Sequence, residues 1–132
     1  MIVVAIIGVL AAMAFISANR VRNRALAARF ASDLQKYQTA FDQYYFQNGA
    51  WPAAAAAGNI PAGMEGALPA NYVMPSSMGG GYSWSGDTGR IRLTSSSASD
   101  DMMQLVDAMI DDGDLTTGAF RSMTSGGYHL QL

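Results

Sequence analysis

The chain has 132 residues, enough for one small domain, and no cysteine, which excludes disulfide bonds and thiolate metal sites. Its net charge of −2 is unevenly distributed. Residues 1–50 carry five basic and two acidic groups, whereas residues 51–132 carry three basic and eight acidic groups. The acidic second part argues against a nucleic-acid partner. The only histidine, glutamate and lysine lie far apart in the sequence and predict no catalytic site: His129, Glu65 and Lys36.

The first eighteen residues, 1–18, contain no charged side chain. A membrane-spanning helix needs roughly 20 mainly apolar residues, so this run is a candidate membrane span. A secretory signal peptide has basic residues before its apolar run, whereas here Arg20, Arg22 and Arg24 follow the run. We therefore predict that the run is part of the working protein.

An amphipathic helix is predicted to continue the apolar run across residues 19–49. Apolar and aromatic side chains recur there at spacings of three and four, which is the period of one helix face. No proline or glycine interrupts the sequence between Val9 and Asn48, and Gly49 can supply a left-handed cap. The pattern predicts one helix of about 48 residues, roughly 70 Å long, within residues 1–49. Its stripe is the predicted contact surface for the rest of the chain: Leu26, Phe30, Leu34, Tyr37, Phe41 and Tyr44.

Residues 50–132 are predicted to form a globular head that begins with a connecting loop over 50–78. The loop is rich in proline and glycine, and its five alanines, 53–57, leave room for one helical turn at most. Alternating runs on either side of Gly86 and Asp87 then predict a β-hairpin. Four large side chains are the expected anchors of the loop: Trp51, Met64, Leu68 and Tyr72.

A short helix and a second hairpin complete the predicted head. Ser97 and Asp100 fit a capping box, and runs at 118–123 and 128–132 predict the closing hairpin. The sequence therefore predicts an α+β fold, with a long N-terminal helix, a small antiparallel sheet, and the order ββαββ after the long helix. The expected apolar face of the short helix consists of Met102, Leu105, Val106, Met109 and Ile110.

Four aspartates lie around Gly113 at the end of the short helix: Asp107, Asp111, Asp112 and Asp114. Asp111, Asp112 and Asp114 offer oxygen ligands close together in the sequence, which suits calcium, although their spacing does not match an EF-hand loop. Gly113 as a left-handed helix cap, with Asp114 accepting a bond from a following backbone amide, explains the same residues without a metal. We predict no cofactor, with calcium near these three aspartates as the alternative.

The apolar run also resembles the N-terminal segment of a known family. Residues 1–12, MIVVAIIGVLAA, are similar to the N-terminal helix of type IV pilins and type II secretion pseudopilins, and the strings GNIPAGMEGALP and IDDGDLTTGAF look like the head of a pilin-like branch without a disulfide. In that family a Phe-Thr-Leu-Ile-Glu start precedes the helix, so the resemblance implies that this sequence begins inside the motif. Ile16 departs from the pattern, because many members have a helix-breaking proline there.

The resemblance implies a structural subunit that polymerises through its N-terminal helix into a type IV pilus-like extracellular filament. It also implies a bacterial cell-surface location, an inner-membrane pool before assembly, and partners that include a prepilin peptidase and the pilus assembly machinery. Seven apolar residues are the expected contacts in the filament core: Ile2, Val3, Ile6, Ile7, Val9, Leu10 and Met13.

Two alternatives to a pilus subunit stay open. One is a pseudopilin of a type II secretion system, and the other is a membrane-anchored binding domain in which the run 1–18 is only an anchor. The arginines that follow the run would by themselves keep the head in the cytoplasm. The resemblance implies the opposite orientation, because the leader of the family is itself basic and holds the N-terminus inside.

Overall fold

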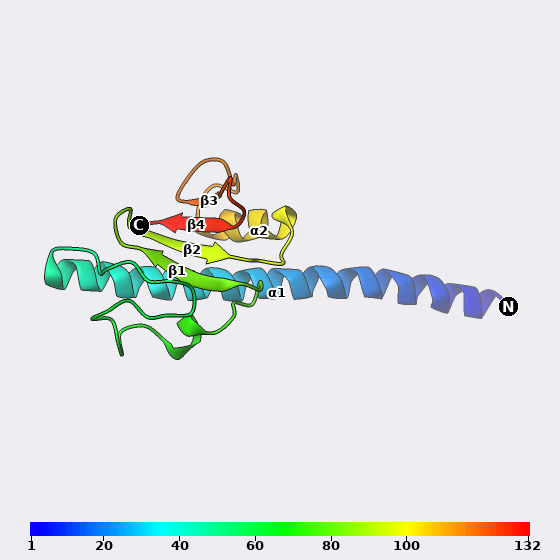
Figure 1. The fold of residues 1–132 in the computed structure, drawn as a ribbon. Coiled ribbons are helices and arrows are strands. Elements are labelled where there is room, and N and C mark those ends of the chain that lie inside the picture. Colours follow the sequence, from blue (N-terminus) through cyan, green and yellow to red (C-terminus); the bar gives the residue numbers. More distant parts are fainter.

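The computed structural model describes all residues 1–132, and it has the predicted α+β fold (Figure 1). The chain begins with a long helix, α1 (Ile2–Asn48), which leads into a loop that contains a short 3₁₀ helix, η1 (Ala70–Val73). A hairpin follows, made of β1 (Gly81–Ser85) and β2 (Arg90–Thr94).

The second half of the head contains helix α2 (Asp100–Ile110) and two strands, β3 (Phe120–Ser122) and β4 (Tyr128–Gln131). This order confirms the predicted ββαββ arrangement. The sheet and α2 lie along the C-terminal half of α1, and the N-terminal half of α1 projects alone from the head (Figure 1).

Helix α1 runs without interruption for 47 residues. It ends where Gly49 adopts a left-handed conformation with φ 70°, and the Gly49 N–H donates to the carbonyl oxygen of Tyr45 at 2.7 Å. Glycine fits this position because it has no Cβ to clash. Ile16 lies within the regular helix, so one straight element joins the apolar run to the head.

The sheet is antiparallel, with the strand order β1-β2-β4-β3. Its register pairs Trp84 with Ile91 and Ile91 with Leu130, so these buried side chains share one face. Because side chains alternate along a strand, the residues between them lie on the opposite face, which points away from the core. The strand pairing thus gives the sheet one apolar and one polar face.

The apolar face of the sheet packs against the predicted stripe of α1 in one hydrophobic core. Phe30, Leu34, Tyr37 and Phe41 are buried there, and Leu26 and Tyr44 are partly buried against the core. Aromatic rings link the two layers. Phe41 stacks on Trp84 with ring centroids 3.9 Å apart, and Tyr37 meets Tyr82 edge to face at 4.9 Å.

The alanine run of the connecting loop is extended and makes no helical turn. Ala55 forms an antiparallel bridge with Trp84, with N–H to carbonyl distances of 3.0 and 2.9 Å, and the indole N–H of Trp84 donates to the Pro52 carbonyl at 3.0 Å. These bonds cover part of the free edge of β1, which would otherwise expose unpaired backbone groups. Of the four expected anchors, three are buried and one is half-buried: Met64, Leu68 and Tyr72, and Trp51.

Two predictions for α2 are wrong in detail. Its N-cap is Ser99, whose hydroxyl accepts from the Met102 N–H at 3.4 Å, and not Ser97. The buried face is centred on Met103, Val106 and Asp107, whereas Met109 is exposed. The reason is tertiary, because contact with α1 decides which side of this short helix is covered.

Candidate functional site

The N-terminal half of α1 has no partner within the fold. The seven residues predicted for the filament core all lie there, and each keeps between 54% and 77% of its surface exposed. By length and composition, α1 is able to cross a membrane, and none of its most apolar window is buried. This surface is the largest apolar feature that the head leaves uncovered.

The seven predicted core residues and the head lie on different sides of α1. At 100° per residue, the seven predicted core residues occupy about half of the helix circumference. The stripe from Leu26 to Tyr44, which packs under the head, is centred roughly 140° away from them. These seven residues therefore point away from the side that the head covers, whereas the exposed Val4, Phe15 and Ile16 lie toward that side.

The acidic turn is the second candidate site, and we define it as residues 107–119, from the last turn of α2 to the loop before β3. The structure brings together the carboxylates of Asp107, Asp111 and Asp112, whose potential ligand oxygens all lie within 4.8 Å of one another. This group contains two of the three aspartates named for the calcium alternative, Asp111 and Asp112, and does not contain Asp114. Asp114 instead accepts from the N–H and the hydroxyl of Thr116, at 3.0 and 2.6 Å, as expected of a turn-forming aspartate.

Backbone and hydroxyl donors hold the two exposed carboxylates of this group. Asp111 accepts from the N–H of Ala119. Asp112 accepts from the Asp114 N–H at 3.0 Å and from the Thr117 hydroxyl at 2.7 Å. The bond from Thr117, followed by that from the Asp114 amide, lowers the pKa of Asp112.

Asp107 differs from its neighbours because it is fully buried and neither carboxylate oxygen has a hydrogen-bond partner. Burial, followed by the nearby charges of Asp112, Asp111 and Asp114, raises the pKa of Asp107 to about 6. The sequence analysis includes this residue in the aspartate cluster around Gly113, but its complete burial was not predicted. Its spacing of four from Asp111 places the two side chains on the same helix face.

A basic face on the sheet also escaped the sequence analysis. The register sets His129 of β4 opposite Arg92 of β2 and opposite Arg121 of β3, on the polar side of the sheet. Arg90 lies on the same side, so all three basic residues of the head share one surface. Burial, followed by the charges of Arg90, Arg121 and Arg92, lowers the pKa of His129.

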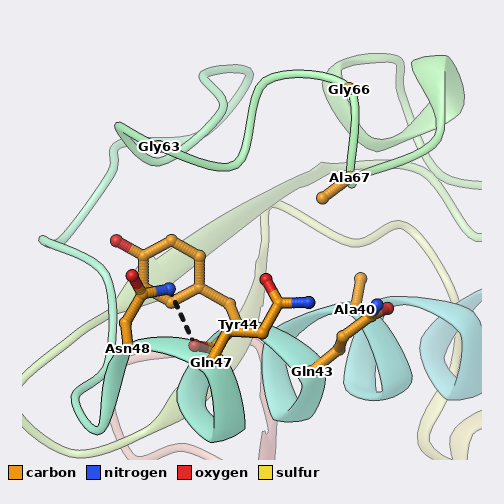
Figure 2. Close-up of a pocket in the computed structure, with 8 residues that line it drawn as sticks. All are labelled: Ala40, Gln43, Tyr44, Gln47, Asn48, Gly63, Gly66 and Ala67. Carbon is orange, nitrogen blue, oxygen red and sulfur yellow. Dashed lines mark hydrogen bonds between the residues drawn. The ribbon is translucent and has the colours of Figure 1, made fainter.

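A hollow between the end of α1 and the connecting loop has no chemistry of its own (Figure 2). The amide of Asn48 donates to the Tyr44 carbonyl at 3.0 Å, which satisfies one of the last carbonyls of the helix. The lining contains no charged side chain and consists of Ala40, Gln43, Tyr44, Gln47, Asn48, Gly63, Gly66 and Ala67. The hollow therefore offers neither an acid nor a base.

Comparison of the chain with protein-family models, with curated proteins and with solved structures found no match. Membership of the pilin family therefore stays a prediction that rests on the N-terminal run.

Proposed function

We propose that the chain is a structural subunit that polymerises through the N-terminal half of α1 into a type IV pilus-like extracellular filament. The observation that carries this proposal is a bare apolar helix continuous with a helix that is built into a folded head. Large contiguous apolar surfaces on a protein mark contacts with other proteins or with a membrane.

The direction of the apolar face supports a bundle with the heads outside. Because the predicted core residues point away from the side of α1 that carries the head, several copies can bring these residues together without a clash between heads. Each square ångström of apolar surface removed from water contributes about 25 cal/mol. A bundle core would thus hold the filament together outside the bilayer.

Small residues on the projecting half also favour association over simple anchoring. Ala5, Gly8 and Ala12 follow one another at spacings of three and four, so they lie on one side of the helix, the side that continues the stripe under the head and not the side of the seven predicted core residues. They offer neighbouring helices a second contact side. Lipid tails are as apolar as leucine, and helices in a membrane associate through close packing at small residues. A plain anchor has no need of such a stripe.

The filament proposal predicts that Ile6→Asp abolishes assembly and leaves the head folded. A carboxylate in an apolar core is strongly unfavourable, costing about 2.5–3.5 kcal/mol even on the mildest membrane scale. The measurement is negative-stain electron microscopy of material sheared from cells, with mass spectrometry of the main band. Met74→Asp, the same kind of change at an exposed apolar residue of the head, is the control and should leave filaments intact. Normal filaments from the Ile6 variant would contradict the proposal.

The implied partners and locations follow from the same proposal. Before assembly the apolar half would lie in the inner membrane, where a prepilin peptidase and the pilus assembly machinery would act on the chain. The assembled filament would stand at the bacterial cell surface. A pseudopilin of a type II secretion system would share these features, and the abundance of sheared filaments separates the two.

The second candidate function is a membrane-anchored binding domain. It is favoured by the ability of α1 to cross a membrane as a single span. An anchor depends on apolar length alone, so replacing residues 2–16 by leucines would preserve its role. The same replacement should prevent assembly of a filament, because it removes the small residues and the specific packing face.

A further inference from the structure

The arginines that follow the apolar run have no acidic partner in the chain. Residues 1–32 contain four arginines and no carboxylate, and the only ion pair in the structure joins Lys36 to Asp33. Arg20, Arg22 and Arg24 are all exposed. A guanidinium group is always charged, and its planar set of donors fits a phosphate group. These three arginines are therefore free to bind an anion from outside the chain.

Two of these arginines line a shallow hollow where α1 leaves the head. Arg20 and Arg24 are four residues apart, so they lie on one side of α1. Helix α2 packs beside α1 (Figure 1), and its half-buried Leu105 lines the same hollow, to which Asn23 adds an amide donor. The hollow measures about 400 Å³, which is within the range of small-ligand pockets. It combines two positive charges with an apolar wall, and this combination suits an amphiphilic anion.

The position of the hollow along α1 matches the headgroup layer of a membrane. At 1.5 Å per residue, Arg20 lies about 3 Å and Arg24 about 9 Å beyond Ala18, where the apolar run ends. A bilayer has a hydrocarbon core about 30 Å thick and a total thickness of about 40–45 Å, so each headgroup layer is roughly 5–8 Å thick. With residues 1–18 in the hydrocarbon core, both guanidinium groups reach the lipid phosphates. This step rests on the membrane location of the apolar half that the proposed function includes.

We propose that Arg20, Arg24 and Leu105 form a binding site for a phospholipid with a negatively charged headgroup. The two guanidinium groups would bind the phosphate, and Leu105 would contact the glycerol and the first acyl carbons. Each arginine near an anionic membrane surface contributes roughly a fivefold gain in affinity. The bound lipid would hold α2, and with it the head, against the membrane surface.

Arg22 distinguishes this site from diffuse attraction to a negative surface. Along the axis it lies between Arg20 and Arg24, but it is about 160° away from both around the helix and does not line the hollow. Diffuse attraction would depend on Arg22 as much as on Arg24, because both lie in the headgroup layer. Asp101, one turn before Leu105 on α2, forms no ion pair with either arginine of the hollow, so the site is not closed by an acid of the chain.

The test measures lipid binding to the full chain in micelles of a neutral detergent. Phosphatidylglycerol and phosphatidylcholine with the same acyl chains would be added in equal amounts, and native mass spectrometry would count the lipids retained. Phosphatidylcholine has the phosphate but no net charge, so it controls for apolar contact. We expect the wild type to prefer phosphatidylglycerol by at least roughly tenfold, since two arginines contribute.

The matched variants are Arg24→Gln and Arg22→Gln, which each remove one positive charge from an exposed position of α1. Arg24→Gln should reduce the preference for phosphatidylglycerol about fivefold. Arg22→Gln should change it by less than about twofold, because the helix is about 10 Å wide and salt screens charges beyond about 8 Å.

Four results would overturn the phospholipid site. Equal losses for the two variants would show diffuse attraction, and equal retention of the two lipids by the wild type would show that the headgroup charge is not recognised. Displacement of the lipid by an equal concentration of inorganic phosphate would indicate a site for the free ion. Retention of neither lipid would also contradict the membrane stage of the proposed function. The measurement uses single chains, so its outcome does not depend on whether the chain forms filaments.

Discussion

His129 lies on the sheet between two arginines that arrive from different parts of the chain. Arg92 faces it from one neighbouring strand and Arg121 from the other. Burial and these positive charges disfavour protonation, so the pKa of His129 is lowered in the folded head. In the unfolded chain the same imidazole has the usual histidine pKa of about 6.5.

The head should therefore lose stability through His129 as the pH falls below about 6.5. Below that pH the unfolded chain takes up a proton that the folded state resists, so the free energy of unfolding decreases until the lowered folded pKa is passed. Denaturant unfolding of the wild type and of His129→Gln across this range measures the effect. The difference between them should grow as the pH falls, and parallel curves would contradict the assignment.

The acidic turn shows what a sequence can and cannot reveal about single residues. The aspartates around Gly113 were identifiable as a group because they are neighbours in the chain. The role of Asp114 as a turn residue was predictable because its carboxylate accepts from the nearby Thr116 N–H, whereas the burial of Asp107 depends on which side of α2 packs inward. Likewise, Arg92 meets His129 only through the pairing of β2 with β4, which no local pattern specifies.

At the level of elements, α1 is the longest element of secondary structure and also forms one side of the hydrophobic core. Its helical period, the left-handed cap at Gly49 and the two hairpins were predictable, because each is set by residues close in sequence. The bridge between Ala55 and Trp84 was not, since it pairs residues from separate segments. Local signals thus predicted most elements, and long-range contacts decided the loop and the inward face of α2.

Substitution of two phenylalanines on α1 tests how this helix packs in the hydrophobic core. Phe41 is fully buried against Trp84, whereas Phe46, five positions later, is 85% exposed. We expect Phe41→Ala to reduce the free energy of unfolding by about 3–5 kcal/mol, since it leaves a cavity. Phe46→Ala should change it by less than about 0.5 kcal/mol, as is usual at the surface. Denaturant unfolding followed by tryptophan fluorescence compares them, and equal losses would refute the packing described.

The whole molecule is a rod with a head along one part of it (Figure 1). Its apolar surface is concentrated at the projecting end, and its negative charge is concentrated in the head. These two properties separate the part that needs apolar surroundings from the part that faces water. The division follows from one uninterrupted helix that changes its environment between Ala18 and Leu26.

An unbroken helix also transmits rotation, so the number of residues between the two halves fixes the direction in which the head faces. One alanine inserted after Ala18 should turn the head by about 100° and bring it to within roughly 40° of the predicted core face. Seven inserted residues make nearly two full helical turns, so the head should return to within about 20° of its original direction. Every head should also move by about 10 Å along the helix axis. Electron microscopy of sheared material should find filaments for the seven-residue insertion and none for the single one. A simple anchor would tolerate both insertions, because a lone head has no neighbour to face.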